Sequence, residues 1–135
     1  MNISESDIEL IEAAEANREE LEILRSRLFL LRGKDKTIMT MYIEKGISCR
    51  RIAMLLGVNA SSVLRRIRKI RQTLTDSIYV SCLKNKERFT QAEMKIATDY
   101  FLDELSIRQI ARRRKASYYE IQQKIKEIKH TANNL

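Results

Sequence analysis

The sequence contains no proline, no tryptophan and only three glycines in 135 residues. Turns in β-rich proteins depend on proline and glycine, so this shortage predicts an all-α protein. No apolar run approaches the ~18 residues of a membrane-spanning helix, and the acidic start of the chain lacks the apolar core of a secretion signal. We therefore expect a cytoplasmic protein with no membrane partner.

Residues that bind metals or perform covalent catalysis are also scarce. The two cysteines, Cys49 and Cys82, make neither a disulfide framework nor a zinc site, and His130 is the single histidine. No glycine-rich phosphate loop is present. These absences predict a binding protein rather than an enzyme, with no metal and no cofactor. The densest acids of the basic part of the chain are expected on a solvated helix face: Glu93, Asp99, Asp103 and Glu104.

Charge is unevenly divided along the chain. The net charge is +8, but residues 1–30 hold eight acids and three bases, a net charge of −5. The other 105 residues therefore carry +13. A basic body of this kind attracts polyanions, of which nucleic acids are the commonest. The alternative is a basic surface that only keeps the protein in solution.

The acidic segment, residues 1–32, is predicted to be a long amphipathic helix. Ser6 and Glu9 have the spacing of a capping box. Apolar residues then recur at alternating steps of four and three, which is a heptad seam that could join two chains in a homodimer. The alternative is that this stripe packs on the chain's own body. The seam comprises Leu10, Ala14, Asn17, Leu21, Leu24, Leu28 and Leu31.

An internal repeat follows the acidic segment. Residues 31–70 align with residues 89–128 without a gap, and nine of the 40 aligned pairs are identical. The shared positions are mainly apolar and have helical spacing, which indicates two copies of one folding unit. We predict two tandem three-helix units at 33–76 and 89–130, with a linker at 77–88 and a tail at 131–135.

The first unit has the pattern of a helix-turn-helix. Ala53 is small where two helices cross, Gly57 gives the turn its freedom, and Val63 attaches the third helix to the second. The third helix of such a unit can enter the major groove of DNA. The alternative is a three-helix bundle without a ligand. A basic outer face on the third helix favours DNA: Arg65, Arg66, Arg68, Lys69 and Arg71.

The framing residues of this unit are Leu31, Ile38, Gly46-Ile47-Ser48, Ile52-Ala53, Leu56-Gly57-Val58, Val63, Ile67 and Leu74. On these residues, the stretch from Leu31 to Leu74 resembles the fourth conserved region of bacterial sigma factors and the related C-terminal domains of response regulators. The second copy, Thr90 to Ile128, resembles a diverged version. The resemblance implies promoter or operator recognition by the third helix, a second helix braced on the DNA backbone, and contact with RNA polymerase. It also implies a bacterial or phage-encoded protein associated with the nucleoid.

The chain departs from the sigma pattern at two positions. Arg51 stands where such units have an acid, and Arg32 where they have a proline. No segment for melting promoter DNA is recognisable. We therefore expect a small regulator that uses the module rather than a complete sigma factor.

Candidate DNA contacts of the first unit follow from this geometry. Arg65 is the best candidate for a bidentate contact to guanine. Side chains further along the third helix are expected to meet phosphates, as is the start of the second helix. The candidates are Ser61, Ser62 and Arg65 for base edges, and Arg66, Arg68, Lys69, Ser48 and Arg50 for phosphates.

The second unit differs in character. Lys115 replaces Gly57 and Arg114 replaces Leu56, which predicts an altered turn and a concentrated basic run. Two linked modules would lengthen the DNA site and raise affinity. Alternatively, its adjacent tyrosines pack between the two units. The candidate contacts are Arg108, Arg112, Arg113, Lys115, Ser117, Tyr118, Tyr119, Gln122, Gln123 and Lys126.

The leading hypothesis is a sequence-specific regulator of transcription that binds double-stranded DNA through tandem helix-turn-helix units. One alternative is the DNA-end-binding module of a transposase or recombinase. Another is an interaction protein that docks on RNA polymerase. Leu55 and Leu64 are apolar at positions that such units usually leave solvated, so they either receive the N-terminal helix or form a partner surface.

Overall fold

The computed structural model describes residues 4–5 and 18–135 of the chain. Regular structure in these residues is helical throughout, with no β-strand among them, which confirms the predicted all-α class. The chain divides into two compact units, unit 1 at Met1–Thr75 and unit 2 at Asp76–Leu135. Each unit buries its own set of apolar side chains.

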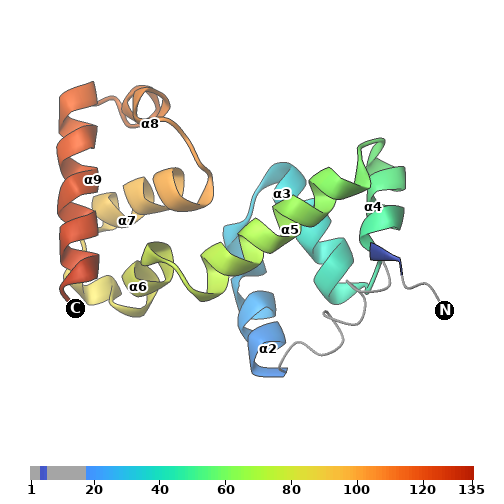
Figure 1. The fold of residues 1–135 in the computed structure, drawn as a ribbon. Coiled ribbons are helices and arrows are strands. Elements are labelled where there is room, and N and C mark those ends of the chain that lie inside the picture. The colour runs from blue at the N-terminus through green and yellow to red at the C-terminus, as the bar shows by residue number, and fades with distance from the viewer. Residues whose placement is uncertain (1–3, 6–17) are drawn as a thin grey trace. The chain divides into compact units, whose positions relative to one another are not determined.

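Unit 1 is organised around one long helix, α5, which contacts the three other α-helices of its described residues (Figure 1). Short 3₁₀ and π-helical turns extend two of those helices. The elements are α2 (Arg18–Arg27), η1 (Leu28–Leu30), α3 (Gly33–Met39), η2 (Thr40–Glu44), α4 (Cys49–Leu56) and α5 (Ala60–Thr75).

One apolar stripe holds α5 in the unit. Val63, Ile67, Ile70 and Leu74 recur at steps of four, three and four, and each is 2% exposed or less. Burial of each such side chain stabilises the fold by about 1.5–3 kcal/mol. The stripe therefore fixes the rotation of α5 about its own axis.

Unit 2 repeats this architecture at a constant offset. From α7 onward, every element begins and ends 58 residues after its counterpart in unit 1. The contacts repeat as well, because α9 contacts α6, α7 and α8 as α5 contacts α2, α3 and α4. The elements of unit 2 are α6 (Ile78–Lys84), η3 (Lys86–Arg88), α7 (Gln91–Ala97), η4 (Thr98–Leu102), α8 (Ile107–Arg114) and α9 (Tyr118–Asn133).

The predicted linker at 77–88 is wrong, because these residues form α6 and η3. Tyr79, Val80 and Cys82 are buried in the core of unit 2, and the Tyr79 hydroxyl lies 3.0 Å from the Thr98 hydroxyl. Since η3 also follows η1 by 58 residues, the structural repeat covers residues 18–75 and 76–133. Within the predicted bounds 33–76 and 89–130 each unit has three α-helices, and among the described residues α2 or α6 adds a fourth.

The acidic segment is likewise part of unit 1 where the structure describes it. Leu24, Leu28 and Leu31 of the heptad seam are each 5% exposed or less in the core of unit 1. This half of the seam is therefore not available to a second chain, as the alternative interpretation predicted. The first half of the seam and the capping box at Ser6 lie outside the described residues, so the homodimer stays a prediction.

The turn before the long helix has the same form in both units. Gly57 has φ +68° and Lys115 has φ +55°, so both end their helices in the left-handed region. The altered turn that we predicted for unit 2 is therefore wrong. The lysine adopts a backbone that favours glycine, which costs energy but preserves the geometry.

None of the helices in the described part of the chain has the length and apolar character needed to cross a membrane.

These turns give a matched pair of stability predictions. Gly57→Ala should lower the free energy of unfolding of unit 1 by about 1 kcal/mol. A Cβ at Gly57 would meet no atom within 4 Å, so the loss reports backbone strain alone. Lys115→Gly should raise the stability of unit 2 by a similar amount. Urea unfolding followed by circular dichroism measures both stabilities. If the two substitutions changed stability in the same direction, the left-handed conformation of both residues would be contradicted.

Candidate nucleic-acid interface

The outer face of α5 is cationic because the apolar stripe points the other way. Arg65 lies about half a helical turn from Val63, so it projects away from the core. Ser61, Arg65, Arg68 and Lys69 are all exposed on this side and define the cationic face of α5. Neither α4 nor α5 contains an acidic residue. An anionic ligand would therefore meet no carboxylate from these two helices.

The side chains of Ser48 and Asn59 cap the starts of α4 and α5. The Asn59 side-chain oxygen accepts a hydrogen bond from the Ser61 backbone N–H at 2.7 Å. The Ser48 hydroxyl oxygen accepts from the Arg51 backbone N–H at 3.3 Å. These caps place Ser61 and Ser62 in the exposed first turn of α5, and Arg50 in the exposed first turn of α4.

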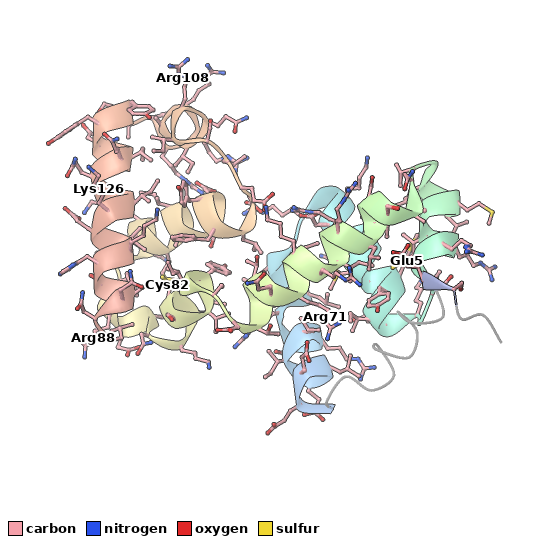
Figure 2. All side chains as sticks on the ribbon, in the orientation of Figure 1. Glu5, Arg71, Cys82, Arg88, Arg108 and Lys126 are labelled. Atoms are coloured by element: carbon pink, nitrogen blue, oxygen red, sulfur yellow. The ribbon has the colours of Figure 1, made fainter. Side chains whose placement is uncertain are left out.

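Arg66, which we predicted to contact a phosphate, is engaged within unit 1. Its Nε and Nη2 donate to the two carboxylate oxygens of Asp35 at 2.8 and 2.5 Å. This bidentate pair joins α5 to α3 and occupies the planar fork that would otherwise clamp a phosphate. Arg71, which is labelled in Figure 2, similarly donates to Glu20 at 2.9 and 3.1 Å and joins α5 to α2. Arg66 and Arg71 therefore fix the position of α5, the helix that carries the cationic face.

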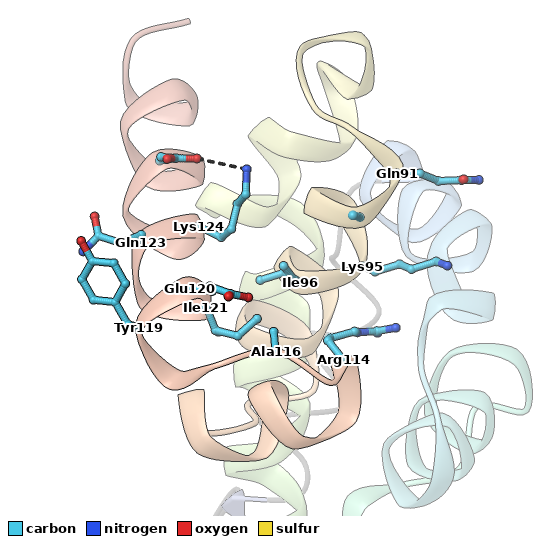
Figure 3. Close-up of a pocket in the computed structure, with 12 residues that line it drawn as sticks. Gln91, Lys95, Ile96, Arg114, Ala116, Tyr119, Glu120, Ile121, Gln123 and Lys124 are labelled. Carbon is cyan, nitrogen blue, oxygen red and sulfur yellow. Dashed lines mark ion pairs between the residues drawn. The ribbon is translucent and has the colours of Figure 1, made fainter.

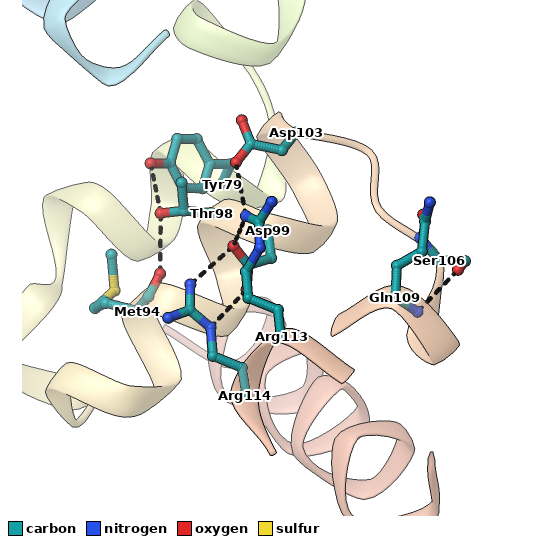
Figure 4. Close-up of polar contacts among 9 residues, drawn as sticks. All are labelled: Tyr79, Met94, Thr98, Asp99, Asp103, Ser106, Gln109, Arg113 and Arg114. Atoms are coloured by element: carbon teal, nitrogen blue, oxygen red, sulfur yellow. Dashed lines mark hydrogen bonds and ion pairs between the residues drawn. The ribbon is translucent and has the colours of Figure 1, made fainter. Parts of the chain in front are cut away.

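Unit 2 uses two of its arginines in the same internal way. Asp99 is completely buried, and its carboxylate accepts from Arg114 at 2.8 and 2.9 Å and from Arg113 at 3.2 Å (Figure 4). Hydrogen bonding to Asp99 is the main reason why the pKa of Arg114 is raised. The solvated position that we predicted for Asp99 is therefore wrong. Because Arg113 and Arg114 bind Asp99, the basic run from Arg112 to Lys115 is only partly available to a ligand.

The sequence did not reveal this buried pair, although the repeat contained its signal. Asp99 and Arg114 occupy the positions of Met41 and Leu56 in unit 1. An apolar pair in one copy is therefore replaced by an ion pair in the other. Comparing both positions at once would have predicted that the two side chains meet.

The outer face of α9 is less basic than that of α5. At the positions of Arg65, Arg68 and Lys69, it has Gln123, Lys126 and Glu127. Tyr118 and Tyr119, at the start of α9, are 50% and 67% exposed.

The other predicted residues of unit 2 lie on or near its surface. Arg108 and Lys126 project from α8 and α9 in Figure 2. Lys124 forms an ion pair with Glu127 at 3.3 Å. The Ser117 hydroxyl oxygen caps α9 by accepting from the Glu120 backbone N–H at 3.1 Å. The exposed residues are Arg108, Arg112, Arg113, Lys115, Ser117, Tyr118, Tyr119 and Lys126, whereas Gln122 and Gln123 are half-buried.

An apolar patch also lies on the surface of unit 1. Met54 and Leu55, on α4, are 74% and 60% exposed, and Val58 follows in the adjoining turn. The repeat places Arg112 and Arg113 at the positions of Met54 and Leu55 in unit 2. The patch is therefore particular to unit 1.

The cysteines take no part in either surface. Both are buried, and burial raises the pKa of the Cys82 thiol, which disfavours the reactive thiolate.

Comparison with protein-family models, curated proteins and solved structures finds no match to this chain.

The buried ion pair of unit 2 gives a stability prediction. Asp99→Ala should lower the free energy of unfolding of unit 2 by about 3 kcal/mol, because it leaves two arginines without their buried carboxylate. The double variant Asp99→Met, Arg114→Leu carries the apolar pair of unit 1 and should recover most of the loss. Urea unfolding of the three proteins measures this. A double variant as unstable as the single one would contradict the equivalence of the two positions.

Proposed function

We propose that the chain is a transcription regulator that binds specific sequences of double-stranded DNA through two helix-turn-helix units. In unit 1, α4, the turn at Gly57 and α5 form the motif, and α5 is the helix that enters the major groove. The observation that carries this proposal is the cationic face of α5 on a pair of helices without a single acid.

The roles of the side chains follow from their places on α5. Ser61, Ser62 and Arg65 lie in its first two turns, where a recognition helix meets base edges. Arg65 supplies the planar fork that matches the two acceptors of guanine. Arg68 and Lys69 lie further along the exposed face and bind phosphates, as does Arg50 at the start of α4.

Unit 2 contributes affinity more than sequence reading. Arg108 and Arg112 on α8 and Lys115 directly after it are exposed, and they bind the DNA backbone. On α9, Lys126 is exposed, but Gln123 and Glu127 stand where α5 has Arg65 and Lys69. The two units together would cover a longer site than either alone.

Substitution of Arg65 tests the assignment of base reading. A preferred duplex is first selected from a random pool. Arg65→Ala should then weaken binding to that duplex by about 1–3 kcal/mol and relax the preference at one base position. Fluorescence polarisation at fixed salt measures both effects. Arg25→Ala, an exposed arginine of α2, is the matched control and should change neither by a comparable amount. Equal losses on every duplex would show that Arg65 contacts only the backbone.

A second function, docking on RNA polymerase, is favoured by the exposed patch of Met54, Leu55 and Val58. Isolated apolar side chains on a surface need no explanation, but adjacent ones exposed to this degree mark protein contacts. DNA binding and docking can coexist, because the patch does not include the cationic face of α5.

Leu55→Ser separates the two functions. It should leave binding to the selected duplex unchanged and weaken binding to purified RNA polymerase, since the patch loses its central apolar side chain. Polarisation and surface plasmon resonance measure the two affinities. A loss of DNA binding with intact polymerase binding would contradict the docking role of the patch.

A further inference from the structure

Unit 2 contains an open groove of about 770 Å³ between α7 and α9 (Figure 3). Its floor is apolar and consists of Ala92, Ile96, Ala116 and Ile121. A volume of this size is within the range of small-molecule sites, which combine an apolar lining with a few placed polar groups.

The repeat explains why the groove is open in unit 2. In unit 1, the pair between Asp35 and Arg66 bridges the helices that correspond to α7 and α9. The counterparts of these residues are Glu93 and Lys124. Glu93 instead accepts from the Thr90 backbone N–H at 2.8 Å, and Lys124 pairs with Glu127 on its own helix. No ion pair therefore joins α7 to α9 among the described residues.

Two charges of opposite sign line the groove and remain available to a ligand. Lys95 comes from α7 and Glu120 from α9, and neither side chain has an ion-pair partner in the part of the chain that the structure describes. The other charged residues of the lining already form ion pairs within unit 2, Arg114 with Asp99 and Lys124 with Glu127. A matching ligand carries one anionic group, one cationic group and an apolar body.

We propose that this groove binds a small zwitterion with an apolar body, of amino-acid or dipeptide size. The ligand carboxylate pairs with Lys95, the ligand ammonium pairs with Glu120, and the apolar side chains cover the floor at Ile96 and Ile121. Bound in this way, the ligand joins α7 to α9 as the pair between Asp35 and Arg66 joins α3 to α5. Binding stabilises unit 2, because the ligand binds only the folded unit.

Calorimetric titration and thermal unfolding of the full chain, without DNA, test the proposal. The probes are leucine, phenylalanine and the dipeptide leucyl-leucine at millimolar concentration. We expect at least one of them to bind and to raise the melting temperature. Acetylation of the ammonium or amidation of the carboxylate of that probe should each weaken binding about tenfold or more, since each removes a charge-assisted contact.

Variants at the groove complete the test. Glu120→Gln should weaken binding of the probe about tenfold. It should not weaken binding of the acetylated probe, because that form has no ammonium to pair with Glu120. Glu87→Gln, at an exposed acid of η3 outside the groove, is the matched control and should bind as the original chain does. Absence of binding by all three probes would overturn the proposal, as would equal binding of the acetylated and amidated forms. Since no DNA is present, the result is independent of the proposed regulator function.

Discussion

The rotation of α5 about its own axis determines what unit 1 can bind. Val63, Ile67, Ile70 and Leu74 face the core, and turning the helix would expose several buried side chains at about 1.5–3 kcal/mol each. Because of this constraint, the cationic face of α5 can only face outward. The same stripe in unit 2, with Ile121, Ile125 and Ile128, fixes α9 in the same way. The two units therefore differ in the residues that they present on the other side of these helices.

The arginines in the described part of the chain differ in their contacts. Some form ion pairs that join helices, and others are exposed to solvent. Arg66 and Arg71 join α5 to its neighbours through Asp35 and Glu20, and Arg114 binds the buried Asp99. Arg65 remains exposed on the helix that the first two hold in place. In unit 2, no ion pair joins α7 to α9 among the described residues, and a groove lies between these two helices. The duplication therefore produced one unit with a strongly cationic face and one unit with an open, mixed-charge site.

The sequence predicted those features that depend on spacing along one helix. The stripe on α5, the caps at Ser48 and Asn59, and the left-handed turn at Gly57 were all visible in the order of residues. Features that depend on contacts between helices were missed. The sequence predicts a linker in place of α6 because residues 76–88 share no identity with residues 18–30. Both stretches nevertheless bury a side chain completely at the same repeat position, Leu24 and Cys82. The partners of Asp99 and Arg66 also lie on other helices, so charge counting overestimated how much of the basic surface is available.

The central claim is that the chain binds duplex DNA through exposed cations. Its most direct test is the affinity of the full chain for a random DNA duplex, measured by fluorescence polarisation over a series of salt concentrations. The account predicts clear binding at low salt. If about six phosphates are neutralised, affinity should fall by about a thousandfold between 50 and 200 mM salt. No binding at low salt, or an affinity that salt does not change, would contradict it.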